Sequence, residues 1–163
     1  MATRSRIGIE LPTGEVKSVY CHWDGYPSYR IPLLLEHYSE REKVEQLIEL
    51  GSICSLRTRL APNDGEIHQC CELINGKLYS KDNDAKDVTI AYARDMMQGD
   101  FVTVNIEENR EAFRIGDVEE YGYLFTLDNE WLYVKGEYPE NSQFMKATDF
   151  KEDNDNNSQS NAY

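Results

Sequence analysis

The chain has 163 residues, and 40% of them are hydrophobic, which is enough for the core of one domain. Thirty acidic residues against 17 basic ones give a formal net charge of −13, so binding to nucleic acid phosphates or anionic membranes is disfavoured. No run of about 18 apolar residues predicts a membrane span, and the N-terminus lacks the apolar core of a secretory signal.

The first predicted element is a β-hairpin over residues 6–23. Ile7, Ile9 and Leu11 alternate along its first strand, and PTGE at 12–15 supplies the turn. Alternation assigns the side chains of the return strand to two faces, with Val19, Cys21 and Trp23 on one and Tyr20 and His22 on the other. The pair Asp24-Gly25 then predicts a turn, and Pro27 ends any strand.

Residues 32–51 are predicted to be helical. Pro32 suits a first helical turn, and Ser39 with Glu42 matches a capping box that begins a second helix. Gly51 is the expected end of that helix. Its apolar positions form the stripe Val44, Leu47 and Ile48. Its acidic positions form a second stripe, Glu42, Glu45 and Glu49, which is either a solvated face or an acidic recognition face.

The rest of the chain predicts short elements. Turns are expected at 62–65 and at Asn75-Gly76, strands at 66–73, 88–94 and 101–106, and a short helix at 107–113. Residues 120–136 predict a second hairpin that turns at Asp128-Asn129. The whole is an α+β fold, with an antiparallel sheet of roughly five strands and a helical pair inserted after the first hairpin. The domain is expected over 1–138, followed by a polar, acidic, disordered tail over 139–163.

Two arrangements of residues suggest chemistry. Cys21, His22 and Asp24 are the residue types of a cysteine hydrolase, although strand alternation separates Cys21 from His22. Four side chains are candidate metal ligands, but their spacing is not that of a zinc site: Cys21, His68, Cys70 and Cys71. No signal peptide and no disulfide framework accompany the cysteines, which favours reduced thiols. The sequence contains no cofactor-binding motif, and we expect no cofactor to bind.

A cluster of aromatic and basic side chains follows the first hairpin. Its members are Tyr20, His22, Tyr26, Tyr29 and Arg30, with Arg4 and Trp23 nearby. Arginine beside aromatic rings can stack a base or a nucleotide, or it can pack a rigid corner onto the sheet. We expect Cys21 and Trp23 to anchor this corner to the core, and Tyr20, His22, Tyr26 and Arg30 to be free for a partner.

Several segments of the chain resemble known proteins: TRSRIGI, GEVKSVYCHWDGYP, LLLEHY, KVEQLIELG, AYARD and EYGYLF. Together they resemble a family of small proteins encoded by bacteriophages and prophages, most strongly over 3–55 and more weakly over 89–134. The family has no assigned catalytic residues to carry over. The resemblance implies phage origin and action in the cytoplasm of an infected bacterium.

Three functions are compatible with these observations. In the first, the chain is an acidic inhibitor of a host defence or nucleic-acid-processing protein. It would bind stoichiometrically to a basic surface, as a DNA mimic does, without contacting nucleic acid or membrane itself. In the second, the aromatic and arginine cluster holds or sequesters a small ligand such as a nucleotide. In the third, the chain is a small cysteine-dependent enzyme. The oligomeric state stays open.

Overall fold

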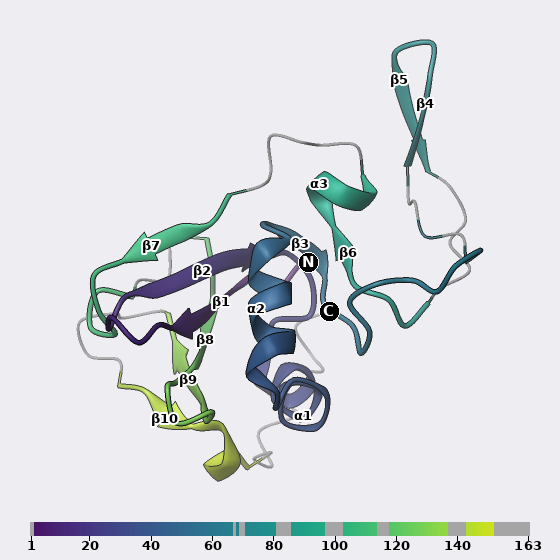
Figure 1. Cartoon of the computed structure of the whole chain (residues 1–163). Coiled ribbons are helices and arrows are strands. Elements are labelled where there is room, and N and C mark those ends of the chain that lie inside the picture. Colours follow the sequence, from purple (N-terminus) through teal and green to yellow (C-terminus); the bar gives the residue numbers. More distant parts are fainter. Residues whose placement is uncertain are drawn as a thin grey trace.

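A computed structural model describes residues 2–66, 68, 71–80, 86–96, 103–113, 118–136 and 143–151. These residues form an α+β fold, as predicted, around a mixed eight-stranded sheet (Figure 1). Its order is β10-β9-β8-β1-β2-β3-β6, and β7 pairs with β2 off this path. The expected number of strands, roughly five, was too low because several strands are only two or three residues long.

Both predicted hairpins are confirmed and form the centre of the sheet. The first joins β1 (Ser5–Glu10) to β2 (Val16–Cys21), with Ile7 opposite Val19 and Gly14 at a φ of 90° in the turn. The second joins β8 (Tyr121–Phe125) to β9 (Trp131–Lys135), with Asn129 at a φ of 60°.

The sheet is mixed and not antiparallel, which corrects the prediction. Strand β1 runs parallel to β8, and β2 runs parallel to β3 (Ile53–Ser55) through the pair Cys21 and Ile53. Parallel neighbours need a long crossover connection, and the two helices supply it between β2 and β3. An alternation of apolar residues marks a strand but does not encode the direction of its neighbour.

The helices differ from the prediction at their starts. Helix α1 (Pro27–His37) begins at Pro27, so Pro32 lies inside it. Tyr26, at φ −72° and ψ 145°, is extended as a residue before proline should be, which places Pro27 at the first helical position. Helix α2 (Arg41–Glu49) follows Glu40, and no side-chain hydrogen bond caps it, so the expected capping box from Ser39 is not formed.

The main core lies between the sheet and these two helices. Figure 1 shows α2 lying across β1 and β2, with α1 beside its lower end. The predicted apolar stripe of α2 is buried and packs on the sheet residues Ile7, Val19, Tyr123 and Phe125. Gly51, at a φ of 79°, ends the helical pair as expected. A smaller cluster of Val16, Phe113, Leu124 and Leu132 forms a second core.

The region after α2 is less regular than the sequence suggests. Of the expected strand at 88–94, only Ile90–Ala91 forms a strand, β6, whereas Val88 makes an isolated parallel bridge with Arg59. The four-residue helix α3 (Tyr92–Asp95) follows β6 at once. The Asp95 carboxylate accepts a hydrogen bond from the Ala91 backbone N–H at 2.8 Å, which favours the helical turn over an extended chain. Strand β7 is Asn105–Glu107, and residues 108–112 form turns in place of the expected helix.

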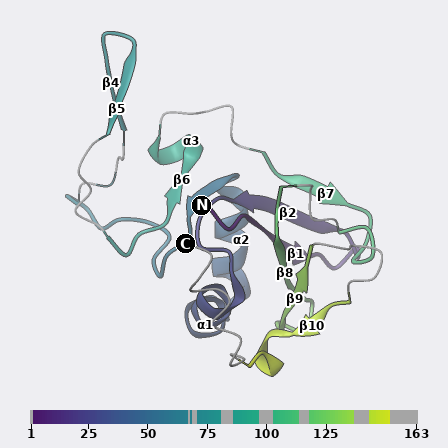
Figure 2. The same cartoon turned by 180° about the vertical axis from the view of Figure 1, so that it is seen from behind.

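Strands β4 (Cys71–Ile74) and β5 (Lys77–Ser80) form a separate two-stranded sheet. Asn75 at φ 51° and Gly76 at φ 82° make its tight turn, as predicted. This hairpin stands away from the main sheet in both views (Figures 1 and 2).

The described fold continues beyond position 138, where the sequence analysis placed the end of the domain. Strand β10 (Met145–Lys146) pairs with β9, and the 3₁₀ turn η2 (Ala147–Asp149) follows it. Ala147 belongs to the main core, and Phe150 packs against it. Residues 139–142 and 152–163 of the expected tail lie outside the described residues.

Candidate functional site

The segment after β2 turns sharply between the sheet and α1. The His22 N–H donates to the Ile53 carbonyl at 2.9 Å, and the Trp23 N–H donates to the Cys54 carbonyl at 3.1 Å. Asp24, at a φ of 58°, then reverses the chain. A Cβ atom on Gly25 would lie 2.7 Å from both Ser5 Cβ and the Thr3 carbonyl oxygen, so only glycine fits there.

Arg30 is inside the protein, which corrects the expectation that it is free for a partner. Its relative exposure is 0%, and Nη2 donates to the Trp23 carbonyl at 2.8 Å and to Cys21 Sγ at 3.3 Å. The physical reason is the early start of α1, which puts Arg30 on the inner face of that helix. Tyr123 closes the same region, because its hydroxyl donates to the Gly25 carbonyl at 2.6 Å.

Trp23 is not a core anchor, whereas Cys21 is completely buried as expected. Strand β2 ends at Cys21, so alternation no longer sets the direction of the next side chains. Trp23 is 42% exposed, and its ring meets the ring of His22 in an edge-to-face contact, with centroids 4.7 Å apart.

Arg4, Tyr20, His22 and Trp23 form one partly exposed group, which we call the Arg4 cluster. The Tyr20 hydroxyl lies 2.7 Å from His22 Nδ1. Burial raises the pKa of the Tyr20 hydroxyl, and a hydrogen bond from Arg4 acts against that rise. Burial, and after it the positive charge of Arg4, lowers the pKa of His22. Both effects favour the neutral form of the imidazole.

The other predicted members of the cluster belong to the start of α1. The rings of Tyr26 and Tyr29 lie 5.9 Å apart at a tilt of 49°, and Tyr29 is exposed. The Tyr26 carbonyl accepts the N–H of Arg30 at 2.9 Å. Tyr26 and Tyr29 thus lie beside the helix entry rather than next to a free arginine.

The geometry does not assemble the hydrolase arrangement. The Cys21 thiol lies on the inner face of the sheet, whereas the His22 ring is held on the outer side by Tyr20, and Asp24 is an exposed turn residue. Among the described residues, no three side chains of His, Cys, Asp or Glu come together as a metal site. Of the expected ligands, Cys70 and the side chain of Cys71 lie outside the description, and His68 makes the contacts reported below.

The acidic stripe of α2, defined by Glu42, Glu45 and Glu49, is exposed. Two basic residues of the same helix point elsewhere. Lys43 Nζ donates to the carbonyls of His37 and Thr58, both at 2.7 Å, and Arg41 donates to the Glu10 carbonyl. Arg41 Nε also lies 3.3 Å from a Glu45 oxygen, but an ion pair as exposed as this one contributes little to stability. The stripe keeps most of its negative charge.

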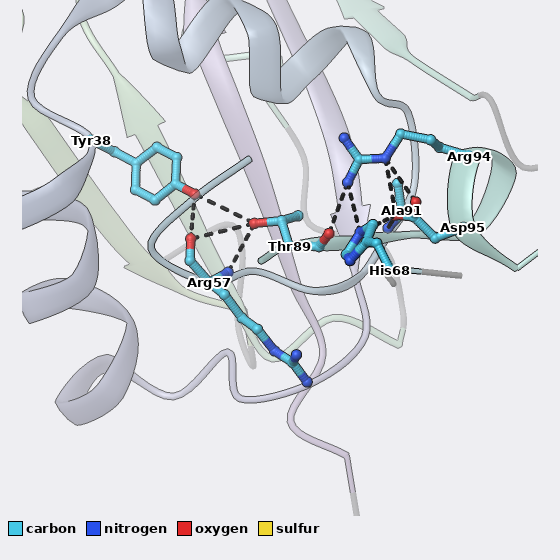
Figure 3. Close-up of polar contacts among 7 residues, drawn as sticks. All are labelled: Tyr38, Arg57, His68, Thr89, Ala91, Arg94 and Asp95. Atoms are coloured by element: carbon cyan, nitrogen blue, oxygen red, sulfur yellow. Dashed lines mark hydrogen bonds and ion pairs between the residues drawn. The ribbon is translucent and has the colours of Figure 1, made fainter. Parts of the chain in front are cut away.

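A buried polar network, missed by the sequence analysis, runs beside the helices (Figure 3). The Tyr38 hydroxyl donates to the Arg57 carbonyl and lies 3.4 Å from Thr89 Oγ1, which accepts the Arg57 N–H at 3.0 Å. Burial raises the pKa of Tyr38 to about 12. The network thus links the end of α1 to the segments at 57 and 89.

The far end of the network holds His68, which was expected only as a metal ligand. His68 Nε2 lies 3.1 Å from an Asp95 oxygen, and Arg94 donates from Nε to the same carboxylate at 2.9 Å and from Nη2 to the Thr89 carbonyl at 2.8 Å. No motif could reveal this group, because its members come from distant parts of the chain. Its contacts fasten His68 to α3 and, through Asp95 and Ala91, to β6.

Comparisons with protein-family models, with curated proteins and with solved structures find no match for this chain. Within the described residues, no helix has the length and apolar character needed to cross a membrane. Of the candidate sites, the acidic stripe and the Arg4 cluster remain as exposed surfaces on which a functional proposal can be built.

Proposed function

We propose that the protein is a phage-encoded inhibitor that acts in the host cytoplasm. It binds a basic surface of a host defence or nucleic-acid-processing protein through the acidic stripe of α2. The observation that carries this proposal is the exposure of the three glutamates of the stripe. The basic residues of the same helix, Arg41 and Lys43, donate to backbone carbonyls of neighbouring segments. The net charge of −13 favours approach to a basic partner.

The spacing of the stripe supports a partial likeness to DNA. Seven residues separate Glu42 from Glu49, which is about 10 Å along a helix axis, or one charge per about 5 Å. One strand of duplex DNA carries a phosphate per about 3.4 Å of axis. The stripe is therefore somewhat sparser than one strand, and it suits competition for a basic groove rather than replacement of a whole duplex.

The test is affinity capture from a bacterial lysate with three versions of the full chain. These are the wild type, the stripe variant E42Q/E45Q/E49Q and a control variant E108Q/D128N/E130Q, which changes the net charge by the same amount at other exposed acids. The wild type and the control variant should recover the same basic protein. The stripe variant should bind it about tenfold more weakly, because three exposed charge contacts contribute roughly 1.5 kcal/mol together.

Two further measurements separate inhibition from incidental binding. Recovery should fall at high salt, because salt screens the charge contacts. It should also fall in the presence of competing duplex DNA, because the DNA occupies the same basic surface of the captured protein. An equimolar amount of the wild type should also suppress the DNA binding or cleavage activity of the captured protein. Equal losses in both variants, or recovery that salt does not change, would count against the stripe as the binding surface.

A further inference from the structure

We propose that the Arg4 cluster is a binding site for a small nucleotide, with its phosphate on Arg4 and His22 and its base against Trp23. This inference uses neither the acidic stripe nor its target, so it stands independently of the proposed inhibition. It depends on three properties of the cluster: the hydrogen bond between Tyr20 and His22, an arginine that takes part in no ion pair with another described residue, and an exposed indole ring.

The contact between Tyr20 and His22 uses one nitrogen of the imidazole and leaves the other, Nε2, for a ligand. The register of β1 and β2, with Ser5 opposite Cys21 and Arg6 opposite Tyr20, brings Arg4 next to this pair. In the proposed site the Tyr20 hydroxyl, which lies 2.7 Å from His22 Nδ1, donates to that nitrogen. A neutral imidazole that accepts at Nδ1 carries its hydrogen on Nε2. No other described residue hydrogen-bonds with Nε2, so its N–H is available to an anionic oxygen.

Arg4 keeps its charge even though the chain is strongly acidic. The neighbouring Arg6 is neutralised by Glu119, whose oxygen lies 2.9 Å from Arg6 Nε. None of the ion pairs within the described ranges includes Arg4. A partly exposed guanidinium next to a neutral N–H donor forms a local site for phosphate oxygens.

Trp23 adds a surface for a planar ring. It is 42% exposed, it is held by its contact with His22 at 4.7 Å, and its backbone is fixed to Cys54. Bases stack on such rings with little regard for their identity. The combination selects a ligand that is both anionic and planar, because inorganic phosphate would leave the indole unused and a nucleoside would leave the two donors unused.

The charge balance favours a nucleotide over a nucleic acid strand. One unpaired arginine can neutralise a phosphate, but a net charge of −13 repels a polyanion with many phosphates. A mononucleotide carries few charges and can bind at this one point.

The experiment is a fluorescence titration of the full chain with the four ribonucleoside 5′-monophosphates. The chain has two tryptophans, and Trp131 is only 4% exposed, so quenching by a bound base reports on Trp23. At least one nucleotide should quench saturably, and the corresponding nucleoside and inorganic phosphate should bind at least tenfold more weakly. Calorimetry on the same samples measures the affinity without relying on the indole.

Matched variants test the two halves of the site. Arg4→Gln and Trp23→Leu should each weaken nucleotide binding by about tenfold in calorimetry. The controls Lys146→Gln and Tyr79→Leu remove an exposed charge and an exposed ring elsewhere and should leave nucleotide binding unchanged. Circular dichroism confirms that each variant is folded. Absence of binding by every nucleotide at millimolar concentration, equal losses in the controls, or tighter binding of an oligonucleotide than of its mononucleotide would overturn the proposal.

Discussion

Burial of the His22 ring, and after it the positive charge of Arg4, lowers the pKa of His22 in the folded protein. In the unfolded chain the same imidazole has the ordinary pKa of about 6.5. Between that value and the lower folded value, the unfolded chain binds more protons than the folded one. The contribution of His22 to stability is therefore complete above pH 6.5 and is lost as the pH falls below it.

The prediction concerns the variant His22→Gln, which does not titrate. The melting temperature of the wild type should fall between about pH 6.5 and pH 5, and the variant should show a smaller fall over the same window. Above pH 7 the difference between the melting temperatures of the two proteins should stay constant. Thermal melting followed by circular dichroism in a pH series measures both slopes. Parallel curves across the whole range would show that His22 has no lowered pKa.

Single side chains near the turn were the least predictable part of the candidate site. Tyr20 lies within β2, where alternation fixes the face, and its 2.7 Å contact keeps the His22 ring beside it although His22 follows the end of the strand. Trp23 and Arg30 were misplaced because one follows the end of the strand and the other depends on where α1 begins. Both boundaries are set by the contacts of residues 22–26 with Ile53, Cys54 and Thr3, which are distant in sequence.

At the scale of elements, Lys43 joins two segments that would otherwise expose carbonyl groups. Its ammonium donates to His37, at the end of α1, and to Thr58, after β3, both at 2.7 Å. It also lies over the Tyr38 ring, 4.2 Å from the centroid. Burial lowers the pKa of Lys43. One side chain of α2 thus fixes the positions of the helix before it and the segment after it.

We predict that Lys43→Met lowers the free energy of unfolding by about 2 kcal/mol, because two carbonyls lose a charged donor while the aliphatic stem is kept. Lys43→Arg should retain most of the stability, since it can still donate to both oxygens. Chemical denaturation of the two variants and the wild type measures the difference. A wild-type midpoint for Lys43→Met would mean that water replaces the ammonium without cost.

Elements that are determined by residues close together in the sequence were predicted well. Both long hairpins, the tight turn at Asn75-Gly76 and the apolar stripe of α2 follow from local patterns. The parallel pairs β1–β8 and β2–β3 and the short strands β3 and β10 were not predicted, and the strands expected at 88–94 and 101–106 are shorter in the structure, as β6 and β7. A strand of two or three residues has no periodicity to detect, and pairing between distant strands leaves no local signal.

At the scale of the whole molecule, residues 143–151 pack against the sheet and the main core. Strand β10 covers the edge of β9, Ala147 is buried in the main core, and Phe150 meets the ring of Tyr133 edge to face, with centroids 5.8 Å apart. These contacts attach the chain after position 142 to the sheet. The polar composition that predicted a disordered tail from 139 did not reveal them, since only a few apolar residues are involved.

Two truncations test this assignment. A chain ending at 138 should lose about 2 kcal/mol of stability, because it exposes the apolar surface under Ala147 and Phe150 and uncovers the edge of β9. A chain ending at 151 should unfold at the same denaturant concentration as the full protein, as expected if 152–163 is a disordered tail. Equal stability of all three chains would contradict a structural role for 143–151.

The parallel pairing of β1 with β8 also sets an order of events during synthesis. Strand β1 is near the N-terminus, but one of its two neighbours begins only at Tyr121. Until β8 leaves the ribosome, β1 can pair only with β2, and its other edge stays open. The sheet therefore closes only once β8 has been made. Because the pairing of β1 with β8 joins residues that are distant in sequence, it slows folding, and the open edge of β1 is prone to aggregation until β8 arrives.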